Sequence, residues 1–222
     1  MITYRNPPNF DSIARNYKLL GRLFFRQHLI QSQTDLLPFV FNPKTVLIVG
    51  GGNGEIIPLL FNSFPNTNIE FVEVSKSMIE IAKDEVARLP TAQISQTKII
   101  EGNINVLEFS KKFDLIIFPY LLDVLSTEEI KLILAKSKTW LTTQGAILHI
   151  DFHLNEMNRF KKGFFKVVTF LLYLFFYLTS QVKMQALPNF HELYLAAGYT
   201  PIQEKRRFSG WLRSCIYKPE IS

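Results

Sequence analysis

The fold is decided by the stretch VLIVGGGNGEI, residues 46–56, in which three consecutive glycines, and a fourth one residue later, follow an apolar run. Glycines between a buried strand and a helix let backbone N–H groups and a helix N-terminus approach a ligand, because no Cβ intervenes. The dinucleotide fingerprint G-x-G-x-x-G needs glycine or alanine at its third position, which here is Glu55. A carboxylate would then face a pyrophosphate, so the sequence disfavours a dinucleotide.

Apolar runs of strand length alternate with helical patterns through the middle of the chain. The apolar runs cover residues 45–50, 68–74, 97–102, 113–119 and 145–151, and the helical patterns cover residues 55–64, 75–89 and 126–141. The last helix begins with Ser126, a preferred N-cap residue, and has Glu128 and Glu129 in its first turn. Continuous apolar runs are typical of parallel strands buried on both faces. The alternation therefore predicts βαβ units and an α/β fold with a doubly wound sheet.

The two ends of the chain differ from this alternation, but the length predicts a single domain over residues 1–222. Residues 1–43 have apolar side chains at helical spacing from Ile13 to Leu37 and predict a helical cap that ends before Pro38. Residues 44–153 then form the cofactor-binding core. Residues 154–190 predict an apolar helical cover, and residues 191–222 supply the final helix and strands.

Glu73 ends the apolar run after the glycine loop, where a carboxylate can accept hydrogen bonds from both hydroxyls of a ribose. At this point the chain resembles the class I S-adenosylmethionine-dependent methyltransferases. Five segments carry the resemblance in the family's order and spacing: VLIVGGGNG (46–54), FVEVSKSMIEIAKD (71–84), IIEGNI (99–104), FDLIIFPYLLDVLS (113–126) and LTTQGAILHIDFH (141–153). In addition, FDSIARNYKLLGRLFF (10–25) resembles the N-terminus of ubiquinone/menaquinone-type C-methyltransferases.

The resemblance implies a Rossmann-like methyltransferase fold. Such a fold has a mostly parallel seven-stranded sheet with helices on both faces, here with an N-terminal helical extension and an apolar helical insertion before the sixth strand. The last strand, SCIYK (214–218), is expected to be antiparallel.

The resemblance also implies S-adenosyl-L-methionine as the cofactor and S-adenosyl-L-homocysteine as its product. Glu73 is then the ribose acid, and Asn103 meets the adenine amino group. The remaining cofactor contacts that the resemblance implies are Gly50, Gly51, Gly52, Gly54, Val74, Met78, Ile104, Phe118 and Tyr17. The family usually has Asp or Glu two residues before the first loop glycine, where this chain has Ile48. Loop carbonyls or other groups must then hold the ammonium group of the cofactor, and a non-catalytic relative with weaker binding stays an alternative.

Side chains at the ends of the fourth and fifth predicted strands are candidates for catalysis: Tyr120 and Asp123 after the fourth, Asp151 and His153 after the fifth. Methyl transfer is an in-line displacement, and positioning alone can supply effective molarities of ~10⁵–10⁸ M. A base within hydrogen-bond reach helps an oxygen or carbon acceptor. Asp151 is equally well explained as a capping or salt-bridging carboxylate, and His153 as a surface residue. His149 is expected to be a core histidine.

Two features bear on the acceptor. Ile117 of IFPY (117–120) stands where amine methyltransferases with a D/N-P-P-Y motif have Asp or Asn, so O- or C-methylation is favoured over N-methylation of an amine. FFKVVTFLLYLFFYL (164–178) is apolar all round a helix of about 22 Å at ~1.5 Å per residue, which is short for a membrane span. It predicts a pocket wall, a homodimer interface, a peripheral membrane contact through residues 159–178 or plain core packing.

Composition limits the remaining possibilities. Cys215 is the only cysteine, which excludes an intrachain disulfide and a cysteine zinc site. His28 and His191 have no companions at ligand spacing, so no metal is predicted. The net charge of +6 indicates scattered surface Lys and Arg rather than nucleic-acid binding, and the polar N-terminus does not resemble a signal peptide. We therefore expect a cytoplasmic enzyme that methylates a small lipophilic or aromatic acceptor, with an RNA or protein methyltransferase and a non-catalytic cofactor-binding scaffold as alternatives.

Overall fold

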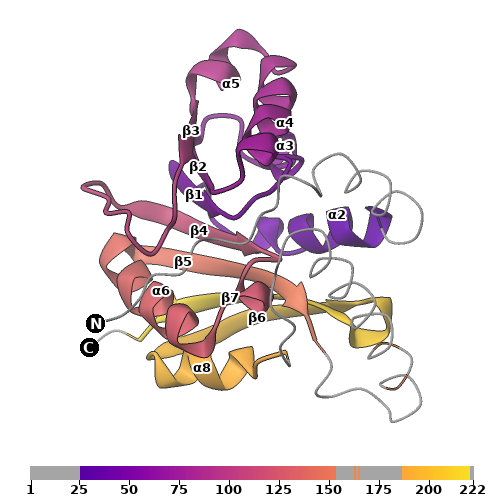
Figure 1. Ribbon diagram of the computed structural model, residues 1–222, viewed down its shortest axis with the longest axis vertical. Helices are drawn as coiled ribbons and strands as arrows, with labels where there is room; N and C mark the ends of the chain where they lie inside the picture. Colours follow the sequence, from indigo (N-terminus) through magenta and orange to yellow (C-terminus); the bar gives the residue numbers. More distant parts are fainter. Residues whose placement is uncertain (1–25, 154–162, 164, 166–186, 221–222) are drawn as a thin grey trace.

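A seven-stranded sheet forms the centre of the computed structural model, which describes residues 26–153, 163, 165 and 187–220. Its order is β3-β2-β1-β4-β5-β7-β6, and Figure 1 shows it running from β3 at the top to β6 near the bottom. The strands are β1 (Thr45–Val49), β2 (Asn68–Glu73), β3 (Thr97–Glu101), β4 (Phe113–Pro119), β5 (Leu141–Phe152), β6 (Tyr199–Arg207) and β7 (Leu212–Pro219). The strand β7 is antiparallel to both of its neighbours, as predicted, and the other pairs are parallel.

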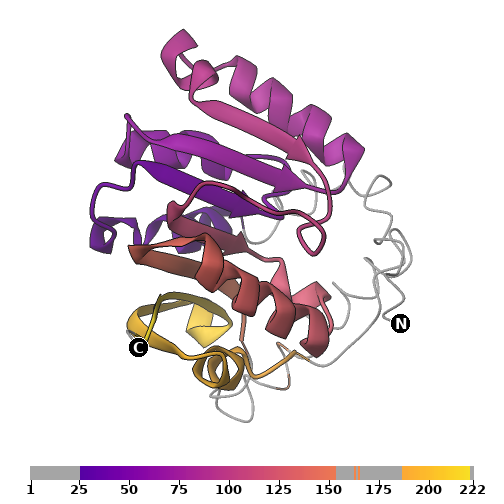
Figure 2. The same ribbon diagram turned by 90° about the vertical axis from the view of Figure 1, so that its left-hand side faces the viewer.

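Helices cover both faces of the sheet, as the two views show (Figure 1, Figure 2). The α-helices are α2 (Arg26–Thr34), α3 (Ile56–Ser63), α4 (Lys76–Ala87), α5 (Thr91–Ser95), α6 (Thr127–Trp140) and α8 (Phe190–Ala196). Short 3-10 helices are η1 (Leu37–Phe39), η2 (Leu122–Val124) and η3 (Phe208–Gly210). Among the described residues, no helix is long and apolar enough to cross a membrane.

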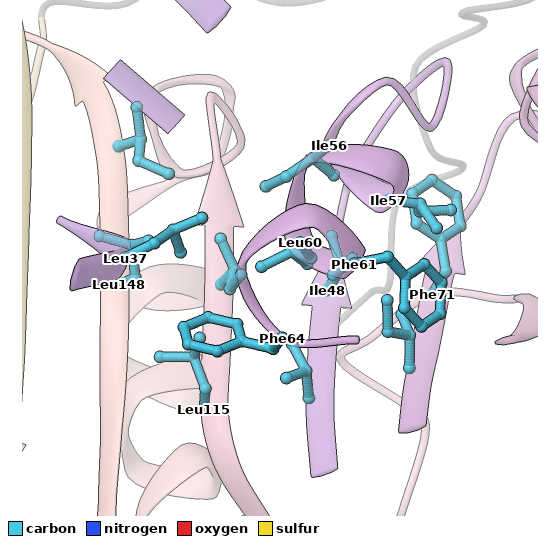
Figure 3. Packing of buried hydrophobic residues seen from close by; sticks show 14 of the residues in the cluster. Leu37, Ile48, Ile56, Ile57, Leu60, Phe61, Phe64, Phe71, Leu115 and Leu148 are labelled. Carbon is cyan, nitrogen blue, oxygen red and sulfur yellow. The ribbon is translucent and has the colours of Figure 1, made fainter. Parts of the chain in front are cut away.

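Successive strand residues face two different core clusters, which explains why the strand sequences are continuously apolar. Ile48, Leu115 and Leu148 pack with side chains of η1, α3 and α4 on one face, and Figure 3 shows Leu60 and Phe64 of this layer against the sheet. On the other face, residues one position earlier or later, among them Leu47, Ile116 and Ile147, pack with α6 and α8. Both faces of the central strands are therefore buried.

Most predicted elements are confirmed, and the differences lie at their ends. The strand β5 begins at Leu141 rather than at residue 145, because Leu141 pairs with Phe113 of β4 and is buried, whereas the polar residues 142–144 interrupt the apolar pattern. The short helix α5 was not expected. The prediction for the last core helix is confirmed: the side chain of Ser126 accepts a hydrogen bond from the N–H of Glu129, and the Glu129 side chain accepts one from the N–H of Ser126.

The predicted N-terminal helix differs at its C-terminal end. The helix α2 ends at Thr34, and residues Leu37–Phe39 form the separate turn η1, which includes Pro38. Proline is tolerated there because the first residues of a helix have no intrahelical acceptor for their N–H groups. The part of the prediction between Ile13 and residue 25 lies outside the described residues.

Candidate functional site

The glycine loop follows β1 at the carboxyl edge of the sheet, where ligands bind in doubly wound folds. Gly52 has φ +57°, and a Cβ added to it would meet no atom within 4 Å. Gly51 is different, because a Cβ there would lie 2.2 Å from the ring of Phe71. Gly51 therefore allows close packing inside the protein, whereas Gly52 faces open space that a side chain would fill.

Glu73 joins this loop to the turn after β2. The side chain is 7% exposed, and its carboxylate accepts hydrogen bonds from three backbone N–H groups: Gly52 to Oε2 at 3.0 Å, Val74 to Oε1 at 2.8 Å and Ser75 to Oε1 at 3.0 Å. Burial raises the pKa of the Glu73 carboxyl, and the three N–H groups oppose that rise. Oε2 has a second lone pair, beside the open space at Gly52, that can accept a hydrogen bond from a ligand. This arrangement fits the predicted role of Glu73 in binding the ribose.

Three further predicted cofactor residues lie next to Glu73 or on the adjacent strand end. Val74 is half-buried, and Met78 is buried in the first turn of α4, whose N-cap Ser75 accepts the N–H of Met78 at 3.3 Å. The side-chain oxygen of Asn103 accepts the N–H of Asn105 at 2.9 Å. This bond orients the Asn103 amide and leaves one lone pair of its oxygen for a ligand donor.

One predicted contact is not supported by its position. Phe118 is 0% exposed within the core of the α6 face, so its side chain cannot contact a cofactor. Ile104 is 7% exposed, as is Glu73, so its burial does not exclude the predicted contact. Tyr17 lies outside the described residues. The sequence could not separate a core residue such as Phe118 of β4 from an apolar residue that contacts a cofactor, because both are apolar.

Asp151 at the end of β5 is deeply buried, at 2% exposed. Its Oδ1 accepts the N–H of Phe152 at 2.8 Å and its Oδ2 accepts the N–H of Asp123 at 3.1 Å. The Nε2 atom of His149 lies 3.3 Å from Oδ2. Of the two interpretations of Asp151, the capping one agrees with these bonds, and His149 is a buried core residue as predicted.

His153 and Tyr120, two other catalytic candidates, are both drawn into the protein. His153 is 7% exposed, so the interpretation of His153 as a surface residue is wrong. Its backbone N–H donates to the carbonyl of Trp211, the residue before β7. The hydroxyl group of Tyr120 lies 2.5 Å from Ser32 Oγ. Tyr120 therefore links the end of β4 to α2.

An aromatic cluster lies beside these strand ends. It consists of Phe152, Phe165, Trp211 and Leu212, bordered by Leu29, Tyr120, Leu187 and Phe208. The rings of Phe165 and Trp211 stack with centroids 5.3 Å apart. Phe165 is the one buried residue that the structure describes in the apolar stretch 164–178, and the rest of that stretch lies outside the described residues.

A small cavity of about 10 Å³ lies between β5, β7 and α8. Its walls include His149, Asp151, His153 and Arg213. That volume suffices for about one water molecule. The cavity is therefore no binding site for a cofactor or an acceptor. Within the described ranges, no group of three or more His, Cys, Asp or Glu could hold a metal ion.

The pair of His149 and Asp151 is held in its neutral form. Burial lowers the pKa of His149, with a smaller contribution from the positive charge of Arg213, and burial raises the pKa of Asp151 against its backbone hydrogen bonds. A protonated Asp151 can donate to Nε2 of His149. The contact is therefore a neutral hydrogen bond and not an ion pair.

The raised pKa of Asp151 makes the free energy of unfolding depend on pH. The folded state keeps the Asp151 proton, which the unfolded chain releases above about pH 3.9, so Asp151 lowers the free energy of unfolding progressively as pH rises from there. Asp151→Asn cannot ionise, and its stability relative to the wild type should rise between pH 6 and pH 9 in urea denaturation. The lowered pKa of His149 reduces the free energy of unfolding only below about pH 6.5. His149 is present in both proteins, so it does not cause the expected difference between them. A pH-independent difference would contradict the neutral pair.

Comparison with known proteins agrees with this geometry. Residues 47–147 match a family model described as a methyltransferase domain. Malonyl-[acyl-carrier protein] O-methyltransferase from Halalkalibacterium halodurans is 30% identical over 112 residues, which are 50% of this chain and 40% of that protein. The chain thus matches less than half the length of this curated relative.

Solved structures share the fold. A putative O-methyltransferase from Nostoc punctiforme aligns with a TM-score of 0.72 at 19% identity, over 97% of this chain and 64% of that one. Human N-acetylserotonin methyltransferase in complex with SAM aligns with a TM-score of 0.64 at 16% identity, over 94% of this chain and 55% of that one. Residues 47–147 thus resemble a methyltransferase domain, and the seven-stranded sheet has the fold of solved methyltransferases.

Proposed function

We propose that this protein transfers a methyl group from S-adenosylmethionine to a small lipophilic or aromatic acceptor in the cytoplasm. The observation that carries the cofactor assignment is the open space at Gly52 next to the Glu73 carboxylate. Glu73 would bind the ribose hydroxyls, Asn103 the adenine amino group, and the loop from Gly50 to Gly54 the amino-acid end. The cofactor supplies an electrophilic methyl group on its sulfonium.

The buried aliphatic side chain of Ile48 provides no carboxylate for the ammonium group of the cofactor. In this proposal that group depends on backbone carbonyls of the loop. The absence of a carboxylate at position 48 limits the affinity for the amino-acid end of the cofactor. The adenosine end keeps both of its polar partners, Glu73 and Asn103.

The acceptor class is supported by the aromatic cluster at the ends of β5 and β7. In this proposal the acceptor binds against these side chains, which are buried in the ligand-free protein, because aromatic surfaces suit lipophilic and planar acceptors. Ile117 in β4 is 0% exposed and offers no acceptor for an amine N–H. These two features favour methylation of an oxygen or carbon over methylation of an amine.

The cofactor assignment is tested by thermal denaturation with S-adenosylmethionine, S-adenosylhomocysteine and NAD. A ligand present at 100 times its Kd stabilises the fold by about 2.7 kcal/mol, so the first two should raise the Tm by several degrees. NAD should leave it unchanged, because Glu55 occupies the third position of the dinucleotide fingerprint. A shift with NAD alone would replace the methyltransferase assignment with a dehydrogenase-like one.

The acceptor class is tested separately with S-adenosylmethionine labelled in its methyl group. The protein is incubated with three fractions from the source cells: an organic-solvent extract, total RNA and total protein. We expect label in the organic extract. Label in RNA or protein would support the alternative acceptor classes, and cofactor binding without label in any fraction would support the non-catalytic scaffold.

A further inference from the structure

The carboxyl group of Asp151 is a junction between the end of β5 and the loop after β4. Its two oxygens accept the N–H groups of Phe152 and Asp123, and the N–H of Leu122 also stabilises its charged form. Asp123 and Leu122 belong to η2. Asp151 therefore satisfies backbone donors of a loop that has no strand partner of its own.

The same loop packs against the glycine loop. Leu121 directly precedes η2, and a Cβ placed on Gly50 would lie 2.7 Å from Cδ1 of Leu121. Leu121 thus touches the first glycine of the cofactor loop. The N–H of Tyr120 donates to the carbonyl of Ile150 at 2.8 Å, which holds the start of the loop to β5.

Asp151 is supported from behind and closed to solvent. His149 lies 3.3 Å from its Oδ2, and the His149 ring packs on Phe190 and Tyr194 of α8 at centroid distances of 4.7 and 5.4 Å. The adjoining cavity holds about one water molecule. An acceptor molecule therefore has no room to reach the carboxyl group as it stands, which argues against a role as general base.

We propose that Asp151 is a positioning residue, whose carboxyl group fixes residues 121–124 against Gly50 and so sets the shape of the cofactor site without touching the cofactor. The binding test of this inference rests on the proposed function, because it uses S-adenosylhomocysteine as the ligand. The order of contacts runs from Asp151 to the N–H groups of η2, then to Leu121, and then to Gly50. Sequence reasoning missed Leu121, because an apolar residue after a strand carries no signal of its contact.

Asp151→Ala should lower the affinity for S-adenosylhomocysteine about 10-fold, measured by isothermal titration at a temperature where the variant is folded. It removes the acceptor for the loop amides. Asp151→Asn should bind within about 3-fold of the wild type, because its amide oxygen, in the place of Oδ2, still accepts the N–H of Asp123 and can accept a hydrogen bond from Nε2 of His149, so that only the bond from Phe152 is lost. Leu121→Ala should reproduce the loss, and the double variant Asp151→Ala/Leu121→Ala should lose less than the sum of the two.

The matched control is Tyr199→Phe, which deletes another buried hydrogen bond, from the Tyr199 hydroxyl to the carbonyl of Leu134 at 2.9 Å. It should lower the Tm and leave the affinity unchanged. The proposal is overturned if Asp151→Ala binds like the wild type, or if Asp151→Asn loses as much affinity as Asp151→Ala, since the latter result assigns the effect to charge.

Hydrogen exchange of the Leu122 and Asp123 amides provides a readout that needs no ligand. Their exchange should be faster in Asp151→Ala than in the wild type and in Tyr199→Phe. Unchanged exchange would refute the loop contact. If the wild type fails to bind S-adenosylhomocysteine, the proposed function is wrong, and the exchange measurement still decides whether Asp151 holds the loop.

Discussion

Glu73→Ala should weaken binding of S-adenosylhomocysteine about 100-fold and lower the free energy of unfolding by about 2–4 kcal/mol. The binding loss follows from removal of the charged acceptor for the ribose hydroxyls. The stability loss follows because the N–H groups of Gly52, Val74 and Ser75 lose their common acceptor. Isothermal titration and urea denaturation measure the two effects separately.

Glu70→Ala is the matched control on the same strand. Glu70 is also buried at 7% exposed, but it pairs with Lys111 at 2.9 Å and lies away from the carboxyl edge. Its replacement should change stability and leave the affinity unaltered. Glu73→Gln, which keeps one side-chain oxygen as an acceptor, should fall between the wild type and Glu73→Ala. Wild-type affinity in Glu73→Ala would exclude this carboxylate from the cofactor site.

Gly52→Val should abolish measurable binding of S-adenosylhomocysteine. The valine side chain would occupy the open space at Gly52, where the cofactor has to approach the backbone. The φ of +57° is unfavourable for a residue with a Cβ and costs about 1–2 kcal/mol, so the variant should stay folded with a lower Tm. Circular dichroism gives the Tm of the variant, and titration well below that temperature separates folding from binding.

Gly210→Val separates backbone strain from blocked space. Gly210 also has positive φ, at +91°, and open surroundings, but it lies in the turn between β6 and β7. This variant should lose stability and keep its affinity for S-adenosylhomocysteine. Equal loss of affinity in both variants would mean that strain, and not the space at Gly52, explains the result.

The core of the fold could be predicted from the sequence because the strands are buried on two faces. Residues such as Leu47 and Ile48 enter opposite clusters, so the strand sequence is apolar throughout and stands out from the amphipathic helices. The start of β5 could not be predicted, since the polar residues 142–144 separate the buried Leu141 from the apolar run. The short helix α5, which has no buried residue, left no apolar pattern to detect.

The part of the candidate site that consists of the glycine loop and Glu73 could be predicted, because its chemistry requires particular residue types at fixed positions relative to the strands. The glycines and Glu73 follow consecutive strands, and the structure brings Gly52 and Glu73 together at 3.0 Å. Burial at strand ends was not predictable, because it depends on distant partners. His153 was thus open to interpretation as a surface residue, although it is buried and its backbone N–H donates to the carbonyl of Trp211, a residue far along the chain.

The backbone bonds of Glu73 also bear on the thermodynamics of ligand binding. The carboxylate already holds Gly52 and Ser75 in the ligand-free protein, so the two loops are ordered during folding and not upon ligand arrival. Binding to a preorganised backbone loses less conformational entropy than binding that must order a loop. Association at this end of the cofactor should therefore be rapid and governed by encounter, with little structural rearrangement of the glycine loop.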